Sequence, residues 1–281
     1  MSVAPGTLYV VATPIGNLDD LSPRARRILE TVAVVACEDT RRTGQLLTRL
    51  GVQQTLLSLH EHNETRRVGE LLEKLRGGQD VALVSDAGTP LVSDPGYRLL
   101  AALREAQLPV CPVPGPSAVI AALSVAGLPS DRFHFEGFLP PKAAARRRRL
   151  QIIAAYPQTL VFYEAVHRID ECLADLADIL GPHRPATLCR ELTKRHETIQ
   201  RGTLAELREL RRSDEGADRG ELTLVVGGQL ADRGPADAEL ERIFGLLVQE
   251  LPPGRAAALA ARITGAKRAD AYRLARLPDP E

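Results

Sequence analysis

The sequence lacks the features that mark several large classes of protein. Its 281 residues contain only four cysteines, which are far apart and form no Cys-x-x-Cys pair, so nothing indicates a disulfide framework or a zinc site. No apolar run reaches membrane-spanning length, and the N-terminus has no basic segment followed by the apolar core of a signal peptide. We therefore expect buried thiols in a reducing compartment and a cytoplasmic location.

Net charge and the common nucleotide motifs are also missing. The 36 basic and 36 acidic residues cancel, so any contact with nucleic acid must come from local patches. No GxxxxGK[ST] motif occurs, which excludes a P-loop protein. No GxGxxG follows the first predicted strand, which argues against a Rossmann dehydrogenase and against the commonest methyltransferase fold.

What is present is an α/β pattern long enough for two domains and a small appendage. In residues 1–116, short apolar runs alternate with helical patterns, which predicts a mostly parallel sheet covered on both faces. The predicted strands of this domain are Thr7–Ala12, Thr31–Ala36, Leu56–Leu59, Asp80–Ser85 and Pro109–Val113. Ser22 and Pro23 are typical of a helix start, as N-cap and first helical residue.

The rest of the chain differs in pattern. Residues 117–230 predict a second α/β domain with a mixed sheet, because clean strand–helix alternation is rarer there. Its predicted strands are Phe133–Phe138, Thr159–Glu164, Ala186–Glu191 and Glu221–Val226. Residues 231–281 read as all-helical, with two short helices around a glycine-containing turn in the outline of a helix-turn-helix.

Three loops at the predicted ends of parallel strands are rich in glycine, proline and small polar residues. They are Thr13–Asn17, Ser85–Gly96 and Val113–Ala118. Each alone is ordinary turn chemistry, but ligands bind at this edge of open α/β sheets, and glycines let a ligand approach the backbone. Within them, Asp86 would suit a cationic group. The segment Cys37–Thr43 (CEDTRRT) is either a salt-bridged turn or a surface that faces the substrate.

Basic residues gather in two places. Lys142 and the run Arg146, Arg147, Arg148 and Arg149 follow a proline pair, and Lys267 and Arg268 lie in the basic terminal segment. The run would form a solvated helix face in many proteins. Four consecutive arginines point all round a helix, however, and are hard to neutralise locally, which favours contact with phosphates.

Several segments together resemble one family. They are LYVVATPIGNLDDLSPRA, CEDTRRT, ALVSDAGTPLVSDPGYRL, PVPGPSA, FEGFLP, FYEAVHR and RELTKRHE, in this order over about residues 7–228. The chain resembles the RsmI family, bacterial 16S ribosomal RNA 2′-O-ribose methyltransferases of the tetrapyrrole-methylase superfamily. The resemblance implies a two-domain, class III methyltransferase fold with the terminal helix-turn-helix segment, S-adenosylmethionine as cofactor, a cytidine ribose of ribosomal RNA or the small subunit as substrate, and a homodimer.

Carried over by position, the resemblance also implies a cofactor site between the two domains. Its residues come from the first-strand loop, the loop after the fourth strand, the hinge and two strands of the second domain. They are Pro14, Gly16, Asn17, Asp86, Gly88, Thr89, Ser117, Ala118, Phe162, Tyr163, Leu222 and Thr223.

Methylation of a ribose hydroxyl needs alignment and a group that helps the hydroxyl lose its proton. The candidates are Glu38 or Asp39 as base, Lys194 as a base of depressed pKa or a stabiliser of the alkoxide, and Arg41 or Arg42 on a phosphate. Asp39 and Arg41 are favoured. His60, His62 and His196 also stay open, and no metal site is visible. Two alternative functions remain: methylation of a tetrapyrrole precursor, and a non-catalytic RNA-binding assembly factor. The target nucleotide is not given by the sequence.

Overall fold

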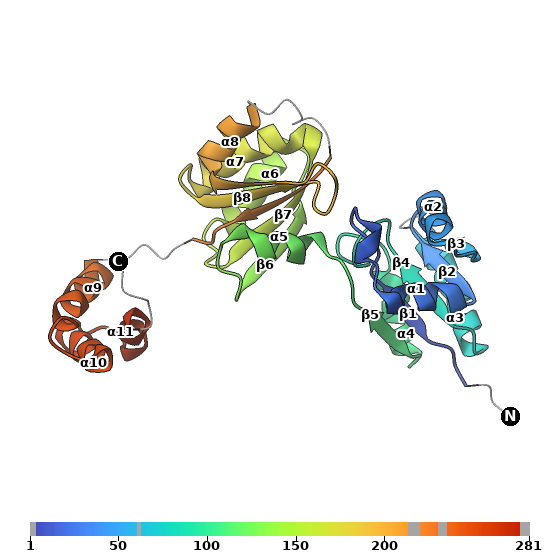
Figure 1. Cartoon of the computed structure of the whole chain (residues 1–281), viewed down its shortest axis with the longest axis horizontal. Helices are drawn as coiled ribbons and strands as arrows, with labels where there is room; N and C mark the ends of the chain where they lie inside the picture. Colours follow the sequence, from blue (N-terminus) through green and yellow to red (C-terminus); the bar gives the residue numbers. More distant parts are fainter. Residues whose placement is uncertain (1–3, 61–62, 213–219, 230–234, 276–281) are drawn as a thin grey trace. The chain divides into compact units, whose positions relative to one another are not determined.

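The structure is a computed structural model that describes residues 4–60, 63–212, 220–229 and 235–275 (Figure 1). The chain forms two compact units, residues 1–228 and residues 229–281. Two separate five-stranded sheets lie within the first unit. We call the parts built around them the first lobe and the second lobe, and we keep the division at residues 116 and 117 as a prediction.

The first lobe contains the predicted parallel sheet. Its strands lie in the order β3-β2-β4-β1-β5, and every pair that is hydrogen-bonded runs parallel. The strands are β1 (Leu8–Val11), β2 (Val34–Cys37), β3 (Leu56–Ser58), β4 (Val81–Val84) and β5 (Val110–Val113). The side chains of β2 and β4 are buried throughout, as expected for strands covered on both faces.

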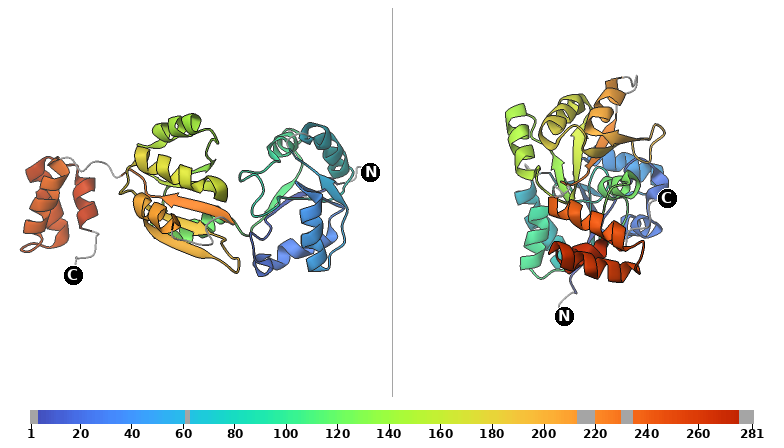
Figure 2. Two further views of the ribbon diagram at one scale, coloured as in Figure 1. Left: turned by 90° about the horizontal axis from the view of Figure 1, so that it is seen from above. Right: turned by 90° about the vertical axis from the view of Figure 1, so that its left-hand side faces the viewer.

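Helices cover both faces of this sheet (Figure 2). On one face, leucines of α3 (Glu64–Arg76) and α4 (Tyr97–Glu105) pack against the strands. On the other, α1 (Pro23–Thr31) and α2 (Thr40–Leu50) do so. The predicted cap of α1 is confirmed, because the Ser22 side chain accepts a hydrogen bond from Ala25 N and Pro23 is the first helical residue.

The second lobe contains the predicted mixed sheet, in the order β6-β7-β10-β8-β9. Only β6 and β7 pair in parallel, and the other pairs are antiparallel. The strands are β6 (Phe133–Phe138), β7 (Thr159–Ala165), β8 (Pro185–Arg190), β9 (Thr198–Thr203) and β10 (Glu221–Val226). The sequence analysis missed β9, because its sequence, TIQRGT, has no buried position and forms a polar edge strand.

The two faces of the second sheet have different partners. One face packs against α6 (Ala143–Ile153), α7 (Ile169–Leu180) and α8 (Leu204–Arg212). The other packs against α5 (Ala118–Ala126) and against Ile15, which comes from the first lobe. Because successive side chains of a strand point to opposite faces, neighbouring residues of β7 and β10 belong to different cores.

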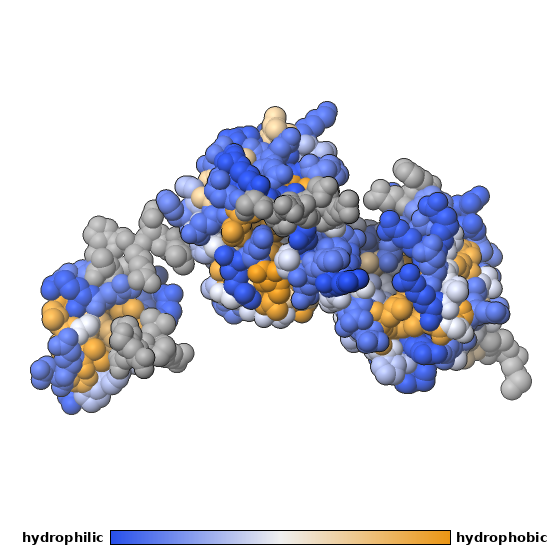
Figure 3. All heavy atoms as spheres, turned by 45° about the horizontal axis from the view of Figure 1, so that its top comes forward, coloured by the Kyte–Doolittle hydropathy of each residue, from blue (hydrophilic) through white to orange (hydrophobic). Residues whose placement is uncertain are grey.

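The second unit is helical, as predicted. It contains α9 (Pro235–Leu247), α10 (Pro253–Thr264) and α11 (Arg268–Leu274), and its small core is rich in alanine. Gly265, in the left-handed conformation, ends α10 before the turn into α11. Apolar side chains also reach the surface of this unit (Figure 3), among them Leu246, Ile263 and Tyr272. The end of the predicted last helix, beyond residue 275, lies outside the described residues.

Membrane-spanning helices and metal-ion clusters are both absent from the described residues. No helix in them is long and apolar enough to cross a membrane. Within the same residues, no group of three or more histidines, cysteines, aspartates or glutamates is placed to hold a metal ion.

Candidate active site

The carboxyl ends of β2, β4, β1 and β5 are neighbours in the first sheet, so the loops that follow these strands meet at one edge. They border a cavity of about 520 Å³, which is the size of a typical small-molecule site. The other border comes from β6, β7, the 3₁₀ helix η2 (Val166–Arg168) and β10 of the second lobe. The residues that line the cavity are Ile15, Glu38, Arg42, Asp86, Ala87, Gly88, Thr89, Val92, Ser93, Asp94, Ser117, Ala118, Phe138, Tyr163, Glu164, Ala165, Val166, His167, Gly220, Glu221, Leu222 and Thr223.

The loop after β4, residues 85–96, has an unusual backbone. Leu91 and Ser93 have positive φ angles of 74° and 69°, although neither is a glycine. Such conformations cost on the order of 1–3 kcal/mol each and persist only where the surroundings enforce them, commonly at functional sites. Gly88, at φ 82°, avoids this cost, and a side chain there would press on Ile15.

Hydrogen bonds fasten this loop to its two neighbours. Thr13 N donates to Gly88 O at 2.8 Å, and Gly88 N donates back to Thr13 O at 3.0 Å. The Thr89 hydroxyl donates to Pro116 O at 3.0 Å, in the hinge after β5. The three glycine- and proline-rich loops noted in the sequence are therefore joined to one another.

Carboxylates line the first-lobe side of the cavity. Asp86 accepts a hydrogen bond from Asp39 N at 3.1 Å and pairs with Arg42 at 3.1 Å. Glu38 and Asp94 line the same cavity. Burial raises the pKa of Asp94 to about 6; hydrogen bonding by Ser85 opposes this, and the charges of Glu38 and Asp86 add to it. This side of the cavity therefore favours a cationic ligand.

The second-lobe side is aromatic. The ring of Tyr163 lies 5.0 Å from the ring of Phe135 and 5.6 Å from that of Phe138, measured between centroids. Burial raises the pKa of Tyr163 to about 12, so its hydroxyl stays protonated at neutral pH. Phe138 is exposed and lines the cavity, so it offers a flat face on which a planar base can stack.

Eight of the twelve cofactor-site residues predicted from the resemblance line this cavity. They are Asp86, Gly88, Thr89, Ser117, Ala118, Tyr163, Leu222 and Thr223. Thr223 of β10 is the register partner of Tyr163 of β7, which explains why the two strands contribute together.

Four predicted cofactor residues do not line it. Phe162 is fully buried among the side chains that pack against α6, α7 and α8, because strand alternation turns it away from the face of Tyr163. Pro14, Gly16 and Asn17 belong to the β1 loop, of which only Ile15 reaches the cavity. Gly16 instead lies against Lys194 of the second lobe, so closely that a Cβ atom would come within 2.3 Å of Lys194 Cγ.

The favoured base, Asp39, has another role in the structure. It is the N-cap of α2, where its side chain accepts a hydrogen bond from Arg41 N at 2.8 Å and pairs with the Arg41 guanidinium at 2.7 Å. These hydrogen bonds from Arg41 hold the pKa of Asp39 well below its usual range. A carboxylate so stabilised is a weak base, and Asp39 does not line the cavity.

Of the two roles predicted for Lys194, that of a base with a depressed pKa is wrong. Its ammonium group pairs with Glu191 at 2.7 Å and with Glu221 at 2.9 Å. Burial alone would lower the pKa of Lys194, but the hydrogen bonds with these two carboxylates outweigh it and raise the pKa above its ordinary value. Lys194 therefore stays protonated and ties the loop after β8 to the start of β10.

The other candidate catalytic residues lie in different parts of the protein, and only some of them line the cavity. Glu38 and Arg42 line the cavity, whereas the Arg41 side chain is 86% exposed and does not line it. His60 follows β3 and contacts Asn63, and His196 is exposed; neither lines the cavity. His62 lies outside the described residues. The histidine that does line the cavity is His167, which the sequence analysis did not consider.

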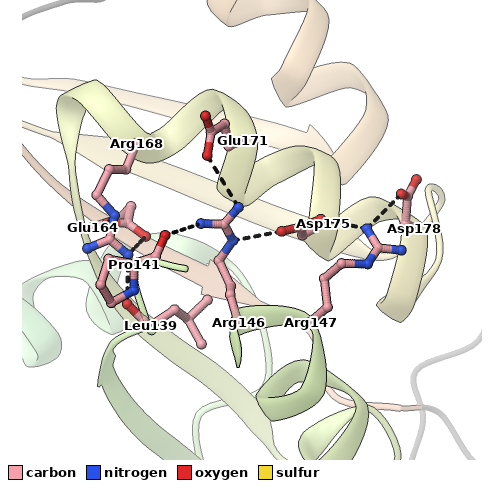
Figure 4. Close-up of polar contacts among 9 residues, drawn as sticks. All are labelled: Leu139, Pro141, Arg146, Arg147, Glu164, Arg168, Glu171, Asp175 and Asp178. Carbon is pink, nitrogen blue, oxygen red and sulfur yellow. Dashed lines mark hydrogen bonds and ion pairs between the residues drawn. The ribbon is translucent and has the colours of Figure 1, made fainter. Parts of the chain in front are cut away.

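The arginine run of α6 is largely neutralised within the protein, contrary to the prediction (Figure 4). The Arg146 side chain is only 2% exposed and pairs with Asp175 at 2.7 Å and Glu171 at 3.4 Å. Arg147 pairs with Asp175 and Asp178, and Arg149 pairs with Glu136. Four consecutive arginines do point in all directions around the helix. One of them, Arg146, therefore faces the interior, where it meets the carboxylates of Glu171 and Asp175 on α7.

Two further arginine contacts hold the segment between β6 and α6 (Figure 4). Arg168 donates to Leu139 O at 2.7 Å and to Glu164 at 3.4 Å, and Arg146 donates to Pro141 O at 3.4 Å. Since Glu164 lines the cavity and Leu139 follows Phe138, these contacts position part of the second-lobe side. The contact between Arg168 and Leu139 could not be predicted from the sequence, because the two residues are 29 positions apart. Of the predicted RNA-binding residues, Lys142, Arg148, Lys267 and Arg268 are exposed.

Comparison with known proteins identifies the class to which this fold and cavity belong. Residues 7–208 match the family model described as Tetrapyrrole (Corrin/Porphyrin) Methylases. Among solved structures, a uroporphyrin-III-C-methyltransferase from Thermus thermophilus is 27% identical, with a TM-score of 0.55, over 79% of this chain and 94% of that one. The two-lobed fold with a cavity at the strand ends is that of a methyltransferase of this superfamily, as the sequence analysis predicted.

More similar relatives narrow the assignment. A protein of Xylella fastidiosa (strain Temecula1) named "Ribosomal RNA small subunit methyltransferase I" is 55% identical over 95% of this chain and 98% of its own length. One of the same name from Escherichia coli O157:H7 is 50% identical over 96% of this chain and 94% of its own length. Residues 234–276 match the model described as "RsmI C-terminal HTH domain". The chain belongs to the RsmI family of the tetrapyrrole methylases.

Proposed function

We propose that the protein transfers a methyl group from S-adenosylmethionine to the 2′-hydroxyl of a cytidine in small-subunit ribosomal RNA. The observation that carries this proposal is the near full-length match to ribosomal RNA methyltransferases, at 50–55% identity and including the terminal helical segment. The proposed location is the cytoplasm, which rests on the sequence features given above. The proposed assembly is a homodimer, which rests on the resemblance.

The cavity residues fit this donor. S-adenosylmethionine would supply a methyl group on a cationic sulfonium. Asp86, Glu38 and Asp94 make their side of the cavity attractive to that charge, while Phe138 and Tyr163 offer aromatic surface to its adenine.

The protein must also hold the ribose in line with the reacting bond. Arg42 lines the cavity and is 67% exposed, and the Arg41 side chain, from the same turn of α2, is almost fully exposed. We assign these two guanidiniums to the phosphates that flank the target nucleotide. Arg148, Lys142, Lys267 and Arg268 would contact phosphates farther along the RNA.

Replacing Lys267 and Arg268 together by alanine should weaken RNA binding without changing donor affinity. Both residues are exposed, at the start of α11. Losing two phosphate contacts should reduce the slope of log affinity against log salt by about 1 to 2. The matched control is Arg242→Ala in the same unit, because Arg242 is an exposed arginine already paired with Glu239. An unchanged salt slope in the double variant would remove these two residues from the interface.

The two alternatives are methylation of a tetrapyrrole precursor and RNA binding without catalysis. The near full-length match to ribosomal RNA methyltransferases, including the terminal helical segment, speaks against the first. RNA binding without catalysis would not require the predicted cofactor residues that line the cavity, so their presence speaks against the second alternative. Incubation with labelled donor and, in parallel, small ribosomal subunits, naked ribosomal RNA or tetrapyrrole precursors tests all three. We expect label in the RNA; label in the tetrapyrrole, or none anywhere, would overturn the proposal.

A further inference from the structure

Asp94 differs from the other carboxyl groups of the cavity in its backbone setting and in its partners. It lies on the loop after β4 and lines the cavity together with Glu38 and Asp86. The backbone around it has little conformational freedom. Ser93 before it has a positive φ of 69°, Pro95 follows it, and Gly96, at φ 124°, is the N-cap of α4. A residue before proline is confined to extended conformations. Strained backbone that fixes one carboxylate in a cavity indicates function.

The neighbours of Asp94 explain why it differs from the other acids of the cavity. Asp86 is engaged by Arg42 and by Asp39 N. Glu164 is engaged by Arg168, and Glu221 by Lys194. Asp94 has no ion pair with a described cation, and its hydrogen-bonding neighbour is the nearly buried hydroxyl of Ser85. The titratable and charged groups that line the cavity with it are Glu38, Arg42, Asp86, Tyr163, Glu164, His167 and Glu221.

We propose that Asp94 is the catalytic residue that accepts the proton of the hydroxyl during methyl transfer, an inference that rests on the proposed function. The hydroxyl oxygen forms a bond to the methyl carbon, the carbon–sulfur bond breaks with its electron pair remaining on sulfur, and the hydroxyl proton passes to Asp94. Atoms and charge balance without a metal ion or any further reactant. The products are the methyl ether, the neutral thioether and a protonated Asp94.

The charges of the cavity favour this transfer. With a cationic donor bound, the nearby positive charge keeps Asp94 ionised and ready to accept a proton. Methyl transfer removes that positive charge. The negative charges of Glu38 and Asp86 then favour the protonated form of Asp94, as they do in the free protein, where burial and these charges raise the pKa of Asp94 to about 6. The proton thus replaces the lost positive charge beside the carboxylates.

The test is the pH dependence of single-turnover methylation of ribosomal RNA, at saturating donor and RNA. We expect the wild-type rate to rise with pH and level off above the pKa of Asp94. Asp94→Asn should be about 10²–10⁴-fold slower, the usual contribution of a general base. Its rate should continue to rise with pH because hydroxide must now remove the proton. Asp94→Glu should restore part of the rate and the levelling-off, which a purely structural role would not do.

Glu38→Gln is the matched variant. It removes a neighbouring negative charge but leaves Asp94, so the inflection should remain and move to lower pH. If Glu38→Gln loses the inflection while Asp94→Asn keeps it, Glu38 is the base and our inference is wrong. If Asp94→Asn methylates RNA with the wild-type rate and profile, the inference fails and the proposed function stands. If the wild-type protein transfers no methyl group to RNA, both fall.

Unfolding measurements show whether Asp94→Asn folds. The pKa of Asp94 is about 6 in the folded state against 3.8 for a free aspartate, so the folded protein loses stability as pH rises through 6. The asparagine variant avoids this loss. We therefore expect it to be more stable than wild type at about pH 8 and to lose that advantage below about pH 4. An inactive variant with this stability profile is a folded protein that lacks a proton acceptor.

Discussion

Asp86→Asn is expected to weaken binding of S-adenosylmethionine about 10- to 100-fold, the usual effect of removing a charge from a hydrogen-bonded ionic contact. Asp86 lines the cavity, and its side chain is only 20% exposed. Asparagine keeps the shape and an oxygen that can accept the hydrogen bond from Asp39 N, so the loss should come from the missing charge. Titration calorimetry measures the affinity.

S-adenosylhomocysteine, which lacks the positive charge, provides the internal comparison for this experiment. Asp86→Asn should affect its binding less than that of the cationic donor, because only the donor gains from the carboxylate. Asp20→Asn, at an exposed position of the 3₁₀ helix η1 (Leu18–Asp20), should change neither affinity. Equal losses for both ligands would indicate that Asp86 shapes the cavity and does not attract the sulfonium.

Asp175→Ala is expected to destabilise the protein by about 3–5 kcal/mol, because it leaves the buried charge of Arg146 with too few partners. Arg146 pairs with Asp175 at 2.7 Å, and its other carboxylate, Glu171, is more distant and mostly exposed. Figure 4 shows Arg146 between these two residues. Urea unfolding measures the change as a lower midpoint with an unchanged slope.

Asp178→Ala is the matched control for that experiment. Asp178 lies on the same helix and pairs with Arg147, but its side chain is 58% exposed. Exposed ion pairs are worth about 0–1 kcal/mol, so this variant should remain close to wild type. If Asp175→Ala and Asp178→Ala lower the free energy of unfolding equally, the buried charge of Arg146 is not stabilised by its ion pair with Asp175.

Local sequence patterns predicted most of the fold. The apolar strands of the first sheet are visible in the sequence because both faces are covered, and Ser22-Pro23 marks the start of α1 by chemistry that needs no distant partner. Strand β9 was missed because an edge strand with polar side chains has no hydrophobic period. The strand and helix pattern also predicted two α/β domains, whereas the cofactor site between them came from the ordered motifs of the family and from no local pattern.

Roles that depend on distant partners could not be predicted. Arg146 and Asp175 are 29 residues apart, so a run of four arginines gave no sign that one of them is buried. Asp39 and Arg41 are neighbours, and a strand-end aspartate before a helix could have been recognised as an N-cap. Asp94 stands out only when Glu38 and Asp86 are seen in the same cavity, since the acids come from two different loops.

Mapping the methyl group on ribosomal RNA shows whether the protein methylates a single cytidine ribose. Small ribosomal subunits and naked RNA would be incubated with the protein and donor, and methylated riboses located by reverse-transcription stops and by resistance of the adjoining phosphodiester to alkali. We expect one modified position, on the 2′-oxygen of a cytidine in the small-subunit RNA. Methyl groups on bases, on many scattered riboses, or on no nucleotide at all would contradict the account.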